Sequence, residues 1–221
     1  MKKIVLAYSG GLDTSYCLKK LSQEKNEVHA VCINTGGFTK TQIKSIKEKA
    51  IKLGAFKFDL IDAVEFYYNN IIKYLIYGNV LRGNTYPLSV SAERTVQAIE
   101  IINYAKKNNA THIAHGSTGA GNDQVRFDML FQIIAPEIEI ITPIRDNSLT
   151  REDETKFLQD HGVNIEWEKA KYSINKGLWG TSVGGDETLT SNKKLPNNAY
   201  PSQLKSNQCE ELTLSFRNGE I

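Results

Sequence analysis

The sequence predicts an α/β fold in which a five-stranded parallel sheet is covered by helices on both faces, followed by the start of a second, α+β domain. Over the first 165 of 221 residues, short β-rich runs alternate with segments of helical periodicity. Parallel strands need such intervening helices, which cover both faces of the sheet. Glycine-rich stretches follow the first and fourth runs, where open parallel sheets bind ligands. The pattern therefore predicts both the fold and the edge of the sheet that carries the site.

The predicted strands are short runs rich in Val, Ile and Phe, which favour strands. They cover residues 3–8, 27–34, 56–61, 111–116 and 137–143. We expect the strand order 3-2-1-4-5, which makes the first and fourth strands neighbours. The two glycine-rich loops would then face each other and form one site.

The predicted helices carry apolar residues at intervals of three and four. They cover residues 13–24, 41–54, 63–76, 91–107, 123–135 and 151–162. The second of these is rich in lysine, which we interpret as a solvated face, and Gly54 is expected to end it. Ser91 is the expected N-cap of the fourth helix.

The pattern changes after residue 165, so we divide the chain into a nucleotide-binding domain, 1–165, and the beginning of a second domain, 166–221. Residues 172–203 are rich in Gly, Ser, Asn and Pro without a sustained period, which indicates a long ordered excursion or a linker. Residues 209–221, CEELTLSFRNGEI, alternate like an antiparallel strand that enters a turn.

Composition excludes several classes of protein. The formal net charge is +2, so overall charge does not indicate binding to nucleic acid or to an acidic membrane surface. The apolar run at 4–8 is too short for a signal peptide, and no stretch approaches the length of a membrane span. Cys17, Cys32 and Cys209 are widely spaced and odd in number, so we expect buried, reduced thiols in a cytoplasmic protein.

The first loop, SGGLDTS at residues 9–15, predicts an anion site. Gly10 and Gly11 permit the backbone angles and close approach that a tight strand-to-helix turn requires. Amide groups at the start of the next helix favour an anion, and neighbouring hydroxyl groups add donors. Neither GxxxxGK[ST] nor GxGxxG is present. The alternative is an ordinary strand-to-helix turn in which Asp13 is the helix N-cap.

The second loop, AHGSTGAGNDQVRF at residues 114–127, predicts a site for an amino acid. Asn122 and Arg126 are four residues apart at a helix start and share a face. Arg126 could bind a carboxylate with two hydrogen bonds, and Asp123 could accept from an ammonium group. The alternative is a polar helix cap with a surface salt bridge.

These residues carry a family resemblance. SGGxD[ST] resembles the pyrophosphate-binding loop of the PP-loop ATP pyrophosphatases, which cleave ATP between its α- and β-phosphates. This resemblance implies that Asp13 both caps the helix and faces a polyphosphate through Mg²⁺ or water. Together with HGSTGAGNDQVRF, it resembles the argininosuccinate synthase family, and YPLSVSAER, YSINKGLWGTS and AYPSQ match that family in the right order. The likeness covers essentially the whole chain and implies an adenine nucleotide alpha hydrolase-like fold. Where relatives commonly have LGT, this chain has Leu88-Ser89-Val90.

The resemblance also implies three groups of site residues. The implied ATP-binding residues are Ala7, Tyr8, Ser9, Gly10, Gly11, Leu12, Asp13, Thr14, Ser15, Ile33 and Gly116. The implied aspartate-binding residues are Thr118, Asn122 and Asp123. The implied citrulline-binding residues are Tyr86, Ser91, Asn122, Arg126, Ser173 and Ser182. N-capping by itself explains Ser91.

The family uses ATP to ligate citrulline and aspartate in arginine biosynthesis, releasing AMP and pyrophosphate through citrullyl-AMP. This chemistry requires positioning and neutralisation of phosphate charge rather than a side-chain nucleophile, so no catalytic nucleophile and no direct metal ligand is assigned. His115 is expected to pack at a strand end, and Trp179 in the core.

Family members continue into a large second domain that supplies further citrulline contacts and much of a homotetramer. This chain ends at Ile221, inside the expected first strand of that domain, so we expect it to bind ATP with Mg²⁺ but to be impaired in synthesis. The alternatives are another PP-loop adenylating ligase, a tRNA-modifying relative or a non-catalytic ATP-binding module. A relative acting on tRNA would show basic or cysteine-bearing recognition elements, so no nucleic-acid or membrane partner is expected.

Overall fold

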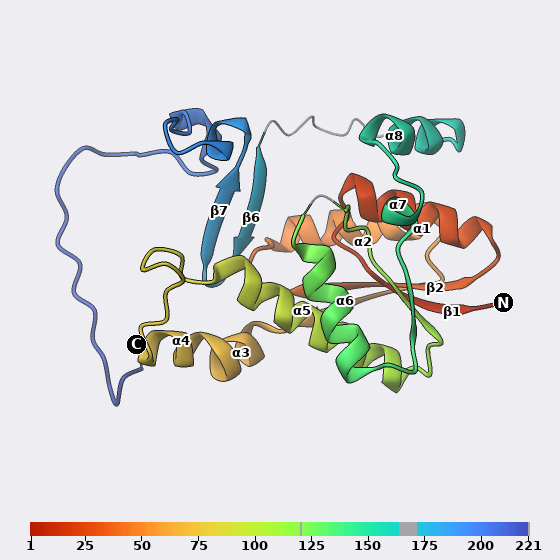
Figure 1. Ribbon diagram of the computed structural model, residues 1–221, viewed down its shortest axis with the longest axis horizontal. Helices are drawn as coiled ribbons and strands as arrows, with labels where there is room; N and C mark the ends of the chain where they lie inside the picture. Colours follow the sequence, from red (N-terminus) through yellow and green to blue (C-terminus); the bar gives the residue numbers. More distant parts are fainter. Residues whose placement is uncertain (120, 164–171, 221) are drawn as a thin grey trace.

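The computed structural model describes residues 1–119, 121–163 and 172–220, and its centre is a five-stranded parallel sheet (Figure 1). The strand order is β3-β2-β1-β4-β5, as the sequence predicts. The strands are β1 (Lys3–Ala7), β2 (Glu27–Asn34), β3 (Lys57–Asp62), β4 (His112–Ala114) and β5 (Glu139–Ile141). In register, Leu6 of β1 lies between Ala30 of β2 and Ala114 of β4. The loops that follow β1 and β4 therefore leave the sheet side by side.

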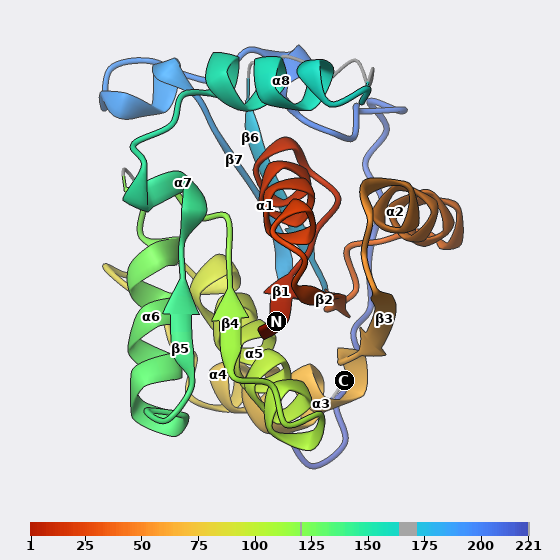
Figure 2. The same cartoon turned by 90° about the vertical axis from the view of Figure 1, so that its right-hand side faces the viewer.

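Helices cover both faces of this sheet (Figure 2). One face carries α1 (Leu12–Gln23) and α2 (Lys40–Leu53), and α8 (Arg151–Asp160) lies over α1. The opposite face carries α5 (Ser89–Lys107) and α6 (Asp123–Ile134). The short α7 (Pro143–Asp146) follows β5.

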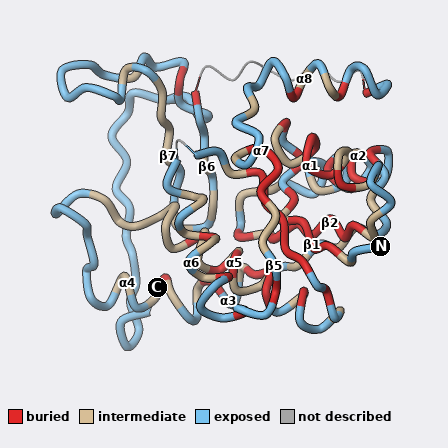
Figure 3. The backbone as a smooth tube through the Cα atoms, turned by 45° about the vertical axis from the view of Figure 1, so that its right-hand side comes forward, coloured by how far each residue is buried: buried red, intermediate tan, exposed pale blue. Residues whose placement is uncertain are grey.

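The core divides into two hydrophobic clusters, one on each face of the sheet. Ile4 and Leu6 of β1 belong to the cluster beneath α1, whereas Val5 belongs to the cluster beneath α5, because successive side chains of a strand face opposite sides. Buried positions therefore run continuously along the central strands (Figure 3). The apolar runs of β1, β2 and β4 are buried on both faces, which is typical of a parallel sheet, whereas the edge strands β3 and β5 are exposed or half-buried.

The helix α2 shows how local sequence sets its ends. The Thr39 hydroxyl accepts from the Gln42 amide, while the Gln42 side chain accepts from the Thr39 amide. Gly54 follows the helix with φ of 100°, a left-handed angle that favours glycine, so the predicted glycine end is confirmed.

Two helix predictions need correction. The segment at 63–76 is divided into α3 (Val64–Tyr67), a π-helical turn η1 (Tyr68–Ile72) and α4 (Lys73–Tyr77). Ser91 is not an N-cap, because α5 begins at Ser89 and its N-cap is Leu88, with φ of 59°. The Ser91 hydroxyl instead donates to the Leu88 carbonyl oxygen at 3.3 Å within the first turn.

The C-terminal segment holds a hairpin that the sequence pattern did not reveal. β6 (Ser173–Gly177) and β7 (Gly180–Gly184) pair antiparallel, whereas the sequence pattern indicated only a long ordered excursion or a linker. Two 3₁₀ turns follow, η2 (Asp186–Leu189) and η3 (Asn197–Ala199). The proposed boundary between residues 165 and 166 lies outside the described residues.

The expected strand at 209–221 is also wrong over its described part. Residues 209–220 are exposed and contain only an isolated bridge between Arg217 and Glu220. This tail ends beside α4, where the Tyr77 hydroxyl donates to the Glu220 carboxylate at 2.9 Å (Figure 1). Cys209 lies on the tail and is exposed, which contradicts its expected burial, whereas Cys17 and Cys32 are buried free thiols.

Among the described residues, no helix has the length and apolar character needed to cross a membrane.

Candidate functional site

A cavity of about 1010 Å³ opens at the carboxyl ends of β1 and β4. Its wall combines the loop after β1, the loop after β4, the polar start of α5 and strand β6. The sequence-predicted residues that line it are Ala7, Tyr8, Ser9, Gly11, Leu12, Asp13, Thr14, Ile33, Gly116, Thr118, Asn122, Asp123, Arg126 and Ser173. Two motifs that are more than 100 residues apart in the sequence thus form one site.

The loop after β1 presents the amino-terminal end of α1 to this cavity. Gly10 has φ of 78°, which favours glycine, and Gly11 is the extended N-cap of the helix. Because the first-turn amides of a helix have no intrahelical acceptor, those at Leu12 and Asp13 are available to an anion. Asp13 is the second residue of α1, so the interpretation of Asp13 as its N-cap is wrong.

The two glycine-rich loops touch at Gly116. A β-carbon at Gly116 would lie 3.1 Å from the carbonyl carbon of Asp13 and 3.2 Å from the amide nitrogen of Thr14. Any larger residue at this position would separate the loops. Gly116 therefore sets the width of the cavity between the first turn of α1 and the end of β4.

Asp123, the first residue of α6, forms ion pairs with two arginines, one on α5 and one on α6. Its carboxylate accepts from Arg126 at 2.6 Å and from Arg94 of α5 at 2.9 Å. The guanidinium of Arg126 that we expected to bind a carboxylate of a ligand is thus paired with a carboxylate of the chain itself. An amino acid that enters the cavity would meet charges of both signs on one wall.

A buried polar cluster on α5 is a feature that the sequence analysis missed. Glu93 is 7% exposed, and its carboxylate accepts from the Thr35 hydroxyl at 2.8 Å and from the Gln97 amide at 3.0 Å. Burial raises the pKa of Glu93, while the Thr35 hydrogen bond and the charge of Arg94 oppose that rise. The signal in the sequence that could have indicated this cluster is the adjacent charged pair Glu93 and Arg94, in a helix whose other face is apolar.

The hairpin β6–β7 is docked on this cluster through side chains and backbone. Arg94 donates to the Asn175 side chain at 2.7 Å, and the Leu178 amide donates to the Thr35 carbonyl at 2.9 Å. The Trp179 indole donates to the Pro87 carbonyl at 2.6 Å and its ring packs against the core beneath α5, in agreement with its expected packing role. The hairpin thereby forms one wall of the cavity.

Five predicted site residues do not line the cavity: Gly10, Ser15, Tyr86, Ser91 and Ser182. Ser15 is fully buried beneath the loop. The Tyr86 hydroxyl accepts from the amides of Val90 and Ser91 at 3.0 and 3.3 Å, so Tyr86 holds the start of α5.

His115 is held by hydrogen bonds on both ring nitrogens. Its Nδ1 accepts from the Ser117 amide at 3.2 Å, so Nε2 carries the proton and donates to Asp128 at 2.8 Å. The ring is 1% exposed and stacks on Phe127. These contacts agree with the predicted packing role at the end of β4.

Glu154 of α8 is a buried carboxyl group behind the first loop. It is 1% exposed, and burial together with the neighbouring Asp13 raises its pKa to about 8. A carboxyl group whose folded-state pKa lies above its unfolded value holds its proton more tightly in the fold. The free energy of unfolding therefore falls as the pH rises between those two values.

We expect Glu154→Gln to remove most of this pH dependence, so that the variant is more stable than the wild type at pH 9 but not at pH 5. The difference should reach about 1–3 kcal/mol, because one pKa unit corresponds to about 1.4 kcal/mol. Urea unfolding at both pH values measures it. Glu152→Gln, on the exposed face of the same helix, is the control. Equal pH slopes for wild type and Glu154→Gln would contradict the assignment.

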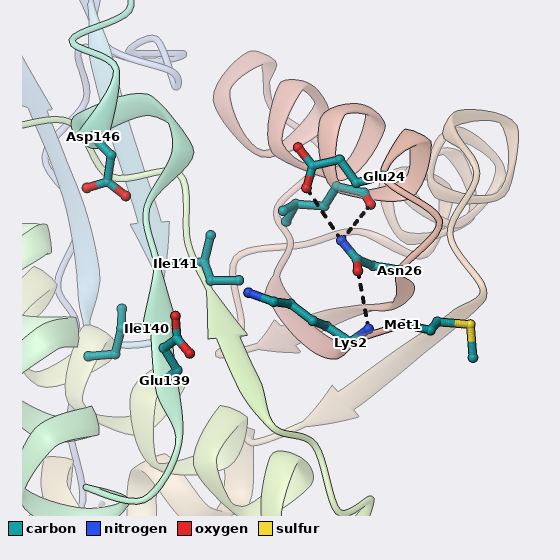
Figure 4. Close-up of a pocket in the computed structure, with 9 residues that line it drawn as sticks. Met1, Lys2, Glu24, Asn26, Glu139, Ile140, Ile141 and Asp146 are labelled. Atoms are coloured by element: carbon teal, nitrogen blue, oxygen red, sulfur yellow. Dashed lines mark hydrogen bonds between the residues drawn. The ribbon is translucent and has the colours of Figure 1, made fainter.

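A second cavity, of about 490 Å³, lies at the opposite, amino-terminal edge of the sheet (Figure 4). Its wall includes Lys2, Asn26 and the carboxylates of Glu24, Glu139 and Asp146. It contains none of the sequence-predicted site residues.

Comparison with known proteins gives one consistent result. A model described as the arginosuccinate synthase N-terminal HUP domain matches residues 3–164. Proteins named argininosuccinate synthase from Saccharolobus solfataricus and Methanocaldococcus jannaschii are 41% and 39% identical over 219 residues. The matches cover 98% and 97% of this chain but 56% and 55% of those relatives. The chain thus spans about half the length of the curated relatives it matches.

Proposed function

Because this chain belongs to the argininosuccinate synthase family, we propose that it forms the nucleotide-binding part of an ATP-dependent ligase. The ligase would join citrulline to aspartate and release AMP and pyrophosphate. The observation that supports this best is the close approach of the two glycine-rich loops at Gly116, where an added β-carbon would lie 3.1 Å from the carbonyl carbon of Asp13 and 3.2 Å from the amide nitrogen of Thr14. It brings an anion-binding helix start and a cluster of paired charges into one cavity.

ATP would lie with its phosphates over the first turn of α1 and its adenosine toward Ile33 and Gly116. The first-turn amides and the hydroxyl of Thr14 offer donors to a pyrophosphate group. The proposed ATP-binding set remains as predicted, with Gly10 and Ser15 supporting the loop from beneath.

Mg²⁺ would accompany the phosphates, and the Asp13 carboxylate on the cavity wall is the oxygen ligand that fits it. The described residues contain no group of three or more His, Cys, Asp or Glu side chains that could hold a metal. One carboxylate would suffice for Mg²⁺ that takes most of its ligands from phosphate and water. The ion would neutralise phosphate charge.

The amino-acid substrates would bind at the part of the cavity wall that carries Asp123 and Arg126. Thr118, Asn122 and Asp123 would bind aspartate, with the Asp123 carboxylate accepting from its ammonium group. Arg126 and Ser173 would bind citrulline at the side of the hairpin, together with Asn122. For Tyr86, Ser91 and Ser182, which lie outside the cavity wall, the proposed citrulline contacts require a shift of the start of α5 and of the hairpin.

The proposed reaction needs no side-chain nucleophile. The ureido oxygen of citrulline would attack the α-phosphorus of ATP, pyrophosphate would leave, and the aspartate amino group would then displace AMP. The chain's own groups orient the three substrates and stabilise phosphate charge, and good orientation can contribute roughly 7–11 kcal/mol. The alternative adenylating ligases of the PP-loop class would share the phosphate loop but not the need for both amino acids.

We further propose that residues 166–221 begin a second domain and that this chain by itself binds ATP but turns over poorly. A non-catalytic ATP-binding module is the second candidate, favoured by the pairing of Arg126 with Asp123, which occupies the guanidinium expected to bind a substrate carboxylate. Release of AMP and pyrophosphate, measured with citrulline and aspartate and with each omitted in turn, separates the candidates. Dependence on both amino acids supports the synthase, ATP binding without turnover supports the module, and full turnover contradicts the expected impairment.

The nucleotide site itself is tested by Gly116→Val. The valine side chain would separate the two loops, so we expect ATP affinity to fall by roughly tenfold or more, a loss of about 1.4 kcal/mol or more. Isothermal titration with Mg-ATP measures it. Gly119→Ala is the matched control, because a β-carbon there meets nothing within 4 Å. Absence of ATP binding by the wild type would refute the proposed function.

A further inference from the structure

Lys49 of α2 contacts the backbone of the phosphate loop from behind. Its ammonium group donates to the carbonyl oxygen of Gly10 at 2.8 Å, 39 residues away in the sequence. From the lysine-rich sequence of this helix we expect its lysines to form a solvated face. Lys44, Lys47 and Lys52 are exposed as expected, whereas Lys49 is partly buried, so for Lys49 that interpretation is wrong.

The peptide between Gly10 and Gly11 has one polar group on each side. A trans peptide is planar, and its carbonyl and amide groups point in opposite directions. Gly10 is buried and does not line the cavity, whereas Gly11 does. The Gly11 amide donates a long hydrogen bond, 3.4 Å, to the Ser9 hydroxyl on the cavity wall. The carbonyl oxygen that Lys49 holds therefore lies away from the cavity, and the amide lies toward it.

We propose that Lys49 is a positioning residue that fixes the Gly10–Gly11 peptide so that the Gly11 amide, rather than the Gly10 carbonyl oxygen, faces the pyrophosphate end of a nucleoside triphosphate. This inference rests on the proposed ATP-binding function. A reversed peptide would place a carbonyl oxygen against phosphate oxygens and remove one donor from the anion site. Glycine at position 11 makes such a reversal accessible, because reversing the peptide changes ψ of residue 10 and φ of residue 11, and φ of Gly11 is not restricted by a β-carbon.

The packing of α2 supports this role. Ile46 and Lys49 are three residues apart on one face of α2, and a β-carbon at Gly10 would lie 3.0 Å from Ile46 Cγ1. Ile46 thus contacts Gly10 from the same helix that supplies the ammonium group. Burial lowers the pKa of Lys49, which agrees with a side chain directed inward rather than into solvent. A lysine can make this contact through a long apolar stem while placing its charge close to the loop.

The decisive variant is Lys49→Met, which keeps a long, unbranched apolar side chain and removes the ammonium group that donates to the Gly10 carbonyl oxygen. We expect affinity for ATP and for inorganic pyrophosphate, each with Mg²⁺, to fall by about tenfold, equivalent to about 1.4 kcal/mol. Adenosine affinity should be unchanged, because its proposed contacts lie at Ile33 and Gly116. Lys49→Arg, which restores a donor, should recover most of the affinity. Lys47→Met, from the exposed face of α2, is the control and should match the wild type.

Two readouts separate this inference from the proposed function and from a folding defect. Thermal unfolding identifies any variant that is not folded, and Lys49→Ala, which also removes the donor, takes the place of Lys49→Met if that variant does not fold. A crystal structure of Lys49→Met reports the peptide orientation without any nucleotide. If wild type binds ATP and a folded Lys49→Met binds it equally well, the inference is overturned. If wild type binds no ATP, the proposed function fails, and an unchanged Gly10 carbonyl orientation in the variant overturns the inference separately.

Discussion

Gly37→Ala is expected to detach the β6–β7 hairpin from the site. A β-carbon at Gly37 would overlap the carbonyl oxygen of Lys176 on β6 and lie 3.0 Å from its carbonyl carbon. The overlapping group is backbone, so a rotamer change cannot relieve the clash. At the neighbouring Gly36, with φ of 94°, a β-carbon would similarly lie 3.2 Å from the backbone of Leu178. The hairpin therefore docks only because two consecutive glycines leave room for it.

Displacement of the hairpin would break the contacts that hold it, including the Leu178–Thr35 and Arg94–Asn175 hydrogen bonds. We expect amide hydrogen exchange over residues 173–184 to accelerate by roughly tenfold or more, because local opening becomes easier while the sheet is unaffected. Exchange mass spectrometry measures both regions in one experiment. Gly184→Ala is the control within the hairpin, since its β-carbon would meet only Thr188 Oγ1 at 3.9 Å. Unchanged exchange in Gly37→Ala would show that the hairpin does not depend on this close approach.

Arg94→Met should be the most destabilising single change in the polar wall of the cavity. The Arg94 side chain is 16% exposed and binds Asp123, Asn175 and Gln97 at 2.9, 2.7 and 3.0 Å. It also lies 3.6 Å from the buried Glu93 carboxylate. Its removal leaves a buried carboxylate without its cation, so we expect the free energy of unfolding to fall by about 3 kcal/mol. Urea unfolding at neutral pH measures the change.

A double-mutant cycle with Glu93→Gln tests the cause. A glutamine at position 93 can still accept from the Thr35 hydroxyl but carries no charge, so Arg94→Met should cost about 1 kcal/mol less in that background. Equal costs in the two backgrounds would mean that the loss comes from Asp123 and Asn175 alone. Because burial raises the pKa of Glu93 and Arg94 opposes that rise, the stability of Arg94→Met should also fall more steeply than that of the wild type as the pH rises through the pKa of Glu93.

The alternation of apolar runs and helical periods predicted the parallel sheet, because hydrophobic spacing is a local property that determines which faces are buried, and the expected strand order is confirmed by the structure. The SGGLDTS and GNDQVRF strings predicted which loops line the cavity. This prediction is also local, since glycine, hydroxyl and charged residues at helix starts have local backbone preferences. Strand order then brought the two loops together at Gly116. The errors at Ser91 and Asp13 are shifts of three and two residues at helix starts, because the actual N-caps, Leu88 and Gly11, make no side-chain capping hydrogen bond and so leave no capping signal in the sequence.

The contacts between distant segments were decided by the tertiary structure. Periodicity does not distinguish the lysines of α2 from one another. Lys44, Lys47 and Lys52 are exposed, whereas Lys49 is partly buried, because α2 packs against the loop at residues 9–15 and Gly10 lies within hydrogen-bond distance of its ammonium group. The hairpin at 173–184 has no strong apolar alternation, since it is docked by glycine contacts and by Arg94 rather than by a hydrophobic face. Sequence by itself determined the sheet and the chemistry of its two loops. Only the tertiary structure decided which polar groups support them, because a hydrogen bond between segments depends on the distance in space and leaves no period in the chain.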